Sequence, residues 1–167
     1  MIKLILFLFV LLFGFFSNCN PEKEDTQKKP QVENDSRKKI IFFGDSLTAG
    51  MGLINPEESF VFLLGKKLKQ DGFDLKVINA GLSGDTTSGG IARLDWSISK
   101  GVDYFILELG ANDGMRGIDP KLIEENLKKI ISRVREKNPS VKILLVRMLA
   151  FPNMGRTYVK EFDSIYP

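Results

Sequence analysis

Short apolar runs of strand length alternate with longer segments of helical periodicity through most of this chain. The apolar runs cover residues 39–43, 75–79, 103–109 and 141–148. Apolar residues recur every three or four positions in 57–70, 87–100, 119–137 and, among more polar residues, 156–165. Strands that are apolar on both faces and alternate with helices indicate a parallel sheet covered by helices on both sides. The predicted fold class is therefore α/β with four parallel strands.

The segment 119–137 gives the most detailed helix prediction. Asp119 is predicted to be the N-cap and Pro120 the first helical residue. The buried side of this helix is predicted to comprise Ile123, Leu127, Ile130, Ile131 and Val134.

The amino-acid composition limits the classes of function that this chain can have. The 167 residues are 43% hydrophobic and carry a net charge of +3, which fits one globular domain. The charges form no basic stripe of the kind that nucleic-acid binders need, so no nucleic-acid partner is expected. The single cysteine excludes an internal disulfide. The absence of histidine excludes a serine–histidine relay, or a histidine metal site, built from this chain alone.

The first nineteen residues are typical of a secretory signal. Lys3 precedes an apolar run over 4–16, which is shorter than the roughly 20 residues that span a bilayer. Ser17-Asn18-Cys19 loosely resembles a lipobox, and lipidation of Cys19 is favoured over an ordinary signal peptide or an uncleaved anchor. The protein is therefore expected to be exported, as a membrane-anchored lipoprotein or a periplasmic protein.

Three regions follow from these patterns: a signal peptide at 1–19, a tether at 20–38 and a single domain at 39–167. The tether is polar and mixed in charge, and Val32 is its only sizeable apolar residue. Such a segment cannot bury enough apolar surface to offset the entropy lost on ordering, so it is predicted to be a disordered spacer.

Three polar, glycine-rich loops follow the first three predicted strands. They cover 44–50, 79–87 and 110–114. Because ligands bind at the carboxyl ends of parallel strands, the three loops are expected to open on one shared rim. Each loop taken alone is a common turn or a helix-capping sequence, but three in this order favour a functional site.

The residues in these loops suit acyl transfer. Ser46, on a tight turn between glycines, can act as a nucleophile if a base takes its proton. Its own N–H, the N–H of Gly84 and the side-chain amide of Asn112 are three donors that could stabilise one oxyanion. Asp45 is interpreted as a cap that holds Ser46 in place, and Arg93 and Trp96 as structural residues.

The segments GDSLTAG, NAGLSGDTTSGGIARL and LELGANDGMRG resemble the first three sequence blocks of the SGNH (GDSL) hydrolases. The resemblance covers 38–167, includes MLAFPNMGRTYVKEFDSIYP, and is greatest to the branch of multifunctional thioesterases, lysophospholipases and arylesterases. It implies a flavodoxin-like three-layer sandwich with a five-stranded parallel sheet, of which four strands are present here. It also implies a small-molecule acyl ester or thioester as substrate, often with a fatty chain, and no metal or organic cofactor.

The resemblance assigns roles to residues of this sequence. Ser46 would be the nucleophile, and the amides of Ser46 and Gly84 with Asn112 would form the oxyanion hole. The substrate would lie beside a group of rim residues: Asp113, Gly114, Met115, Phe151 and Pro152. Methionines are suited to such a rim because they adapt to flexible apolar ligands, although ordinary packing is as good an interpretation for each one singly.

The chain departs from the family pattern at one point. The family ends in an Asp-x-x-His block that supplies the general base, and this chain contains no histidine. The sequence is expected to be a fragment or a recent truncation rather than a decayed enzyme, because the other site residues are intact. Little or no hydrolysis is expected from these 167 residues, and the fourth strand should present an uncovered edge. The alternatives are a carbohydrate O-deacetylase and a non-catalytic membrane-anchored remnant.

Overall fold

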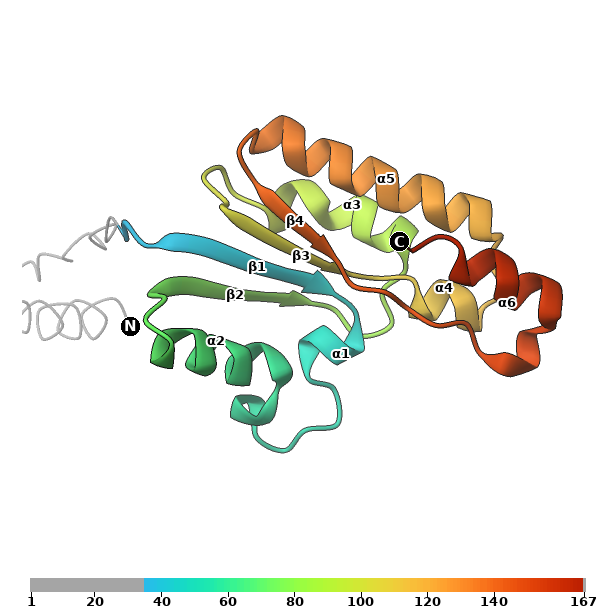
Figure 1. Cartoon of the computed structure of the whole chain (residues 1–167), viewed down its shortest axis with the longest axis horizontal. Coiled ribbons are helices and arrows are strands. Elements are labelled where there is room, and N and C mark those ends of the chain that lie inside the picture. Colours follow the sequence, from blue (N-terminus) through green and yellow to red (C-terminus); the bar gives the residue numbers. More distant parts are fainter. Residues whose placement is uncertain (1–34, 167) are drawn as a thin grey trace, which may run out of the picture. The chain divides into compact units, whose positions relative to one another are not determined.

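The computed structural model describes residues 35–166. Its centre is a parallel sheet of four strands: β1 (Lys38–Gly44), β2 (Leu75–Gly81), β3 (Tyr104–Glu108) and β4 (Lys142–Leu145). The strand order is β2-β1-β3-β4, and all three pairings are parallel. The predicted α/β fold with four parallel strands is confirmed. All four carboxyl ends therefore point to the same edge of the sheet, as Figure 1 shows.

Helices cover both faces of the sheet (Figure 1). On one face lie α3 (Thr87–Ser97) and α5 (Pro120–Lys137). On the other face lie α1 (Ser46–Ala49), the 3-10 turn η1 (Pro56–Glu58) and α2 (Phe60–Gln70). Beyond the carboxyl ends of β3 and β4 lie α4 (Ala111–Met115), the 3-10 turn η2 (Pro152–Met154) and α6 (Arg156–Asp163).

The alternation of side chains along the strands divides the core into two parts. Ile41 and Phe43 of β1 point toward α3 and α5, where the larger apolar cluster lies. Ile40 and Phe42 point toward α2 and pack with Val61 in a smaller cluster. The face with the larger cluster is thus sealed by two helices, and the opposite face chiefly by α2.

Helix α5 confirms the helix prediction in detail. Asp119 is its N-cap and accepts a hydrogen bond from the Lys121 N–H at 2.9 Å, and Pro120 is its first residue. Four of the five residues predicted for its inner side are buried, and the fifth is partly buried against the same cluster: Ile123, Leu127, Ile130, Val134 and Ile131.

Several predicted boundaries were wrong. The helix predicted over 57–70 is divided, because Ser59 is extended and caps α2 by accepting the Phe62 N–H at 3.3 Å. The helix predicted over 87–100 ends at Ser97, since Ile98 is extended. The strand predicted over 141–148 pairs with β3 only at Lys142–Leu145. The helix predicted over 156–165 ends at Asp163.

Trp96, interpreted from the sequence as structural, is 77% exposed on α3, so it contributes little to the core.

Strand β4 is an edge strand of the sheet. Within residues 35–166 it has a neighbouring strand on one side only, as the uncovered-edge prediction required. Its Leu144 is 58% exposed.

The predicted signal peptide, the lipidation site at Cys19 and most of the predicted tether lie outside the described residues. Strand β1 begins at Lys38, the residue at which the predicted tether ends, and Arg37 pairs with Asp74 at 3.6 Å. Within the part of the chain that the structure describes, no helix has the length and apolar character needed to cross a bilayer.

Candidate active site

Strand β1 delivers the serine turn to the rim of the sheet. Asp45 is buried and caps α1 by accepting the Leu47 N–H at 3.0 Å, as the interpretation of Asp45 as a cap predicted. Ser46 is the first residue of α1 and is partly exposed. The turn requires glycine at position 44, because a Cβ there would lie 2.1 Å from Thr48 Oγ1 and 2.7 Å from the Glu108 carbonyl oxygen.

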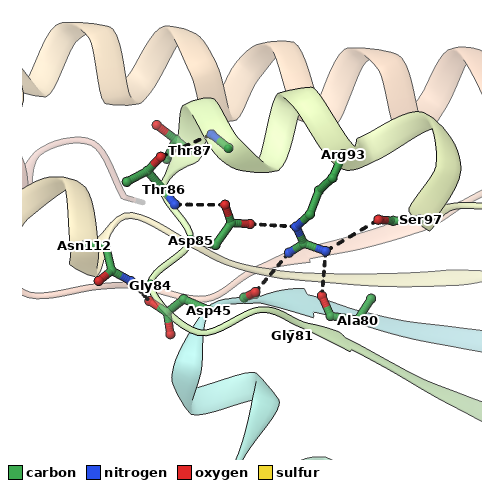
Figure 2. Close-up of polar contacts among 12 residues, drawn as sticks. Asp45, Ala80, Gly81, Gly84, Asp85, Thr86, Thr87, Arg93, Ser97 and Asn112 are labelled. Atoms are coloured by element: carbon green, nitrogen blue, oxygen red, sulfur yellow. Dashed lines mark hydrogen bonds and ion pairs between the residues drawn. The ribbon is translucent and has the colours of Figure 1, made fainter. Parts of the chain in front are cut away.

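Asn112 reaches the serine turn from α4. Its Nδ2 donates a hydrogen bond to Asp45 Oδ2 at 3.1 Å, and both residues are buried. The asparagine amide carries two hydrogens, and this bond uses one of them. Figure 2 shows the contact between Asn112 and Asp45 below the start of α3.

Gly84 lies at the exposed tip of the loop between β2 and α3. Its φ is +78°, a left-handed conformation that favours glycine. Its carbonyl accepts a hydrogen bond from Arg116 Nη2 at 3.2 Å, which ties this loop to the end of α4. The loop from the second strand and the loop from the third strand are therefore joined at the residue whose N–H was predicted to be an oxyanion donor.

The residues predicted for substrate contact fall into two groups. Asp113 and Gly114 are buried in α4. The Asp113 carboxylate accepts hydrogen bonds from the Thr87 N–H at 2.9 Å and from Thr87 Oγ1 at 2.6 Å. Gly114 lies against Phe162, whose ring would be 3.0 Å from an added Cβ. Met115, Phe151 and Pro152 are exposed, beyond the carboxyl ends of β3 and β4.

A buried glutamate under the serine turn was missed by the sequence analysis. Glu108 ends β3 and is 3% exposed. Its Oε2 accepts hydrogen bonds from Thr48 Oγ1 at 2.7 Å and from the Asp45 N–H at 3.3 Å, whereas its Oε1 is buried without a partner. An acidic residue inside the apolar run of 103–109 was the available signal.

The two acidic residues beneath Ser46, Glu108 and Asp45, both have raised pKa values. Burial raises the pKa of Glu108, and the nearby Asp45 charge raises it further, against the hydrogen bond from Thr48. Burial likewise raises the pKa of Asp45, against the hydrogen bonds from Leu47 and Asn112. The serine turn thus rests on two carboxyl groups whose pKa values are both raised by burial.

No group of three or more potential metal ligands is gathered at one point within residues 35–166. The rim instead brings together the partly exposed hydroxyl of Ser46 and the side-chain amide of Asn112, which reaches the preceding residue, Asp45, from α4. A hydroxyl and donors in that arrangement suit the attack on a carbonyl group and the stabilisation of the resulting oxyanion.

The fold of this domain matches solved structures. One is the crystal structure of AlinE4, an SGNH-hydrolase family esterase, with a TM-score of 0.73 and 40% sequence identity; the match covers 78% of this chain and 69% of that chain. Residues 42–165 match the model of the GDSL-like Lipase/Acylhydrolase family, and the chain belongs to that family.

Two curated relatives carry enzyme names. The arylesterase of Vibrio mimicus is 40% identical over 135 residues, covering 80% of this chain and 66% of the relative. The thioesterase 1/protease 1/lysophospholipase L1 of Escherichia coli is 35% identical over 129 residues, covering 77% of this chain and 59% of the relative. The chain thus spans roughly three fifths to two thirds of the length of these relatives.

Proposed function

We propose that this chain carries the nucleophile and the oxyanion hole of a serine hydrolase that acts on small acyl esters and thioesters. Ser46 is the nucleophile. The Ser46 N–H, the Gly84 N–H and Asn112 Nδ2 are the oxyanion donors. The observation that carries the proposal is the 3.1 Å bond from Asn112 to Asp45, which brings an amide donor from α4 against the residue that precedes Ser46.

The names of the relatives support this substrate class. They include an arylesterase and a thioesterase 1/protease 1/lysophospholipase L1, and the esterase, thioesterase and lysophospholipase activities in these names cleave acyl groups from oxygen or sulfur. The exposed Met115 and Phe151 on the same rim offer an apolar surface on which an acyl chain could rest.

The proposed reaction needs a general base that these 167 residues do not supply as histidine. A serine hydroxyl is a weak nucleophile until a neighbouring group takes its proton, and the 167 residues contain no histidine. We therefore expect little or no hydrolysis by this polypeptide alone. Free imidazole has the same chemical function as a histidine side chain, and it should act as an external base if it can reach the partly exposed Ser46.

The test is the hydrolysis of p-nitrophenyl butyrate with increasing imidazole. After subtraction of the reaction of imidazole with the ester in buffer, the unmodified chain should show a rate that rises with imidazole. Ser46→Ala should show none. Ser99→Ala is the matched control. This exposed serine lies in the loop before β3, at the amino-terminal ends of the strands and therefore away from the carboxyl ends where Ser46 lies.

Two results would change the proposal. Equal imidazole-dependent rates for the unmodified chain and Ser46→Ala would remove Ser46 as the nucleophile. Turnover without imidazole that is lost in Ser46→Ala would keep Ser46 but refute the expected inactivity. Repeating the assay with an acyl thioester and an acetylated sugar separates the acyl hydrolase from the carbohydrate O-deacetylase.

We also propose that the protein is exported and anchored through a lipid on Cys19. The proposal rests on the apolar run over 4–16 followed by the chain's only cysteine. In a bacterial host fed radiolabelled palmitate, the unmodified chain should incorporate the label and Cys19→Ala should not. Equal incorporation by the two chains, or none by either, would exclude lipidation at Cys19.

A further inference from the structure

Arg93 of α3 lies buried behind the rim, where it binds groups from three other segments (Figure 2). Its Nε donates to Asp85 Oδ2 at 2.7 Å, its Nη1 to the Ala80 carbonyl at 2.8 Å and its Nη2 to the Gly44 carbonyl at 3.0 Å. The guanidinium also lies over the ring of Phe43, 3.8 Å from the ring centroid. The side chains of the Arg93–Asp85 ion pair are only 7% and 4% exposed.

The partners of Arg93 flank the proposed oxyanion hole in the sequence. Gly44 immediately precedes Asp45 and Ser46, and Asp85 immediately follows Gly84. The Arg93 side chain therefore binds both Gly44, two residues before Ser46, and Asp85, the residue after Gly84. We propose that Arg93 is a positioning residue that sets the separation between the Ser46 turn and the Gly84 N–H, an inference that rests on the proposed function.

Arginine suits this position for a physical reason. Its guanidinium presents five donors in a fixed plane, so it can bind a carboxylate and two carbonyls in different directions at once while stacking on an aromatic ring. A lysine ammonium is a single point of charge and cannot reach all three acceptors. Removing either partner of the ion pair would also leave a buried charge unpaired.

The glycine at position 89 is a second sign that the position of the Asp85 carboxylate is fixed. Asp85 Oδ1 accepts the Thr86 N–H at 3.0 Å on the side away from Arg93. A Cβ at Gly89 would lie 2.1 Å from the same Oδ1. Glycine inside a helix is less favourable than alanine, yet α3 has glycine at this point. The helix therefore accommodates the Asp85 carboxylate at the expense of its own propensity.

The test compares Arg93→Lys and Gly89→Ala with a matched control, Arg133→Lys. Arg133 also joins α3 to a neighbouring element, through the Ile91 carbonyl at 3.2 Å and Asp95, but contacts neither loop of the site. The first readout is the Ser46-dependent, imidazole-dependent hydrolysis of p-nitrophenyl butyrate. We expect kcat to fall about 10- to 100-fold in both site variants with KM little changed, because a displaced oxyanion donor affects the transition state. Arg133→Lys should keep the full rate.

The second readout does not require activity. Two-dimensional 1H–15N spectra should show shifted Ser46 and Gly84 amide signals in Arg93→Lys and Gly89→Ala, but not in Arg133→Lys. The Leu82 amide donates to the same Gly44 carbonyl at 3.0 Å, so its hydrogen exchange should accelerate about tenfold or more when Arg93 is replaced.

The outcomes separate the two proposals. If the unmodified chain shows no Ser46-dependent rate, the proposed function fails, and the amide signals still decide the role of Arg93. If Arg93→Lys does not fold, Gly89→Ala decides, because it keeps Arg93 and acts only by displacing the Asp85 carboxylate. Unchanged Ser46 and Gly84 signals in a folded variant, or an equal loss of rate in Arg133→Lys, would overturn the positioning role.

Discussion

Asn112 has one amide hydrogen bound to Asp45, and in the proposed function its second amide hydrogen binds the oxyanion at Ser46. We predict that Asn112→Ala lowers the imidazole-dependent rate of Ser46 about 10²- to 10³-fold, the usual effect of losing one oxyanion donor. The matched control is Asn126→Ala, since the Asn126 amide binds Thr87 Oγ1 at 3.1 Å, between α5 and α3. Equal rates for Asn112→Ala and the control would remove Asn112 from the oxyanion hole.

Glu108 makes a pH-dependent contribution to stability. Its pKa in the folded chain is raised by burial, so above the ordinary glutamate value of about 4.3 the folded state holds its proton longer than the unfolded state does. Stability contributed by neutral Glu108 is therefore present at low pH and is lost as the pH rises through the window up to the raised pKa.

We predict that Glu108→Gln removes this part of the decline, because glutamine stays neutral at every pH. The measurement is the free energy of unfolding in urea between pH 4.5 and pH 8 for the unmodified chain, Glu108→Gln and Glu125→Gln. Glu125 is exposed on α5, so its variant controls for the change in net charge. Parallel pH profiles for all three chains would show that Glu108 ionises in the folded state as it does in the unfolded state.

The role of a single residue could be predicted from the sequence where its partner lies only a few positions away. The capping role of Asp45 follows from its place before a short helix, and its bond to the Leu47 N–H spans two positions. The partners of Asp113 and Glu108 could not be predicted in the same way, because Thr87 and Thr48 are 26 and 60 positions away. Only the folded sheet brings these pairs together.

The elements were predictable where apolar periodicity is strong and failed where it is not. Helix α5, with apolar residues at regular spacing and a proline start, was predicted to the residue. Helices α1 and α4 lie in segments predicted to be loops, because 46–49 is short and 111–115 contains Asn, Asp and Gly, which have low helix propensity. Tertiary bonds such as Asn112 to Asp45 and Asp113 to Thr87 hold α4 instead.

Strand β4, at one edge of the sheet, exposes an apolar side chain at which aggregation could begin. Leu144 points to the sparsely covered face and is 58% exposed, whereas Ile143 packs against the larger core cluster. Charged residues on edge strands oppose intermolecular pairing. We predict that Leu144→Lys reduces aggregation, measured by light scattering, and changes the free energy of unfolding by less than about 0.5 kcal/mol.

The matched variant on β4 is Ile143→Lys, which should destabilise the domain because it places a charge against the core. Equal scattering from Leu144→Lys and the unmodified chain would show that aggregation does not begin at this edge of the sheet.

At the scale of the whole molecule, three separate loops meet because parallel strands end at one edge. Ser46 follows β1, Gly84 follows β2 and Asn112 follows β3. Loops that follow adjacent strands β2, β1 and β3 must lie beside one another, so the sequence order of strands and glycine-rich loops was sufficient to predict the rim. The distances within the rim depend on Arg93, Asp113 and Arg116, whose partners become apparent only in the folded domain.

The most direct test is a crystal structure of the chain after reaction with an alkylphosphonate ester in the presence of imidazole. The phosphonyl group mimics the tetrahedral intermediate of acyl transfer. We predict a phosphorus–oxygen bond at Ser46 Oγ, formed as the ester's alkoxide or phenoxide leaving group departs from phosphorus and imidazole takes the serine proton. The phosphonyl oxygen should lie about 2.7–3.1 Å from the Ser46 N, the Gly84 N and Asn112 Nδ2. An adduct on another residue, or an oxygen turned away from Gly84 and Asn112, would contradict the assignment of this site.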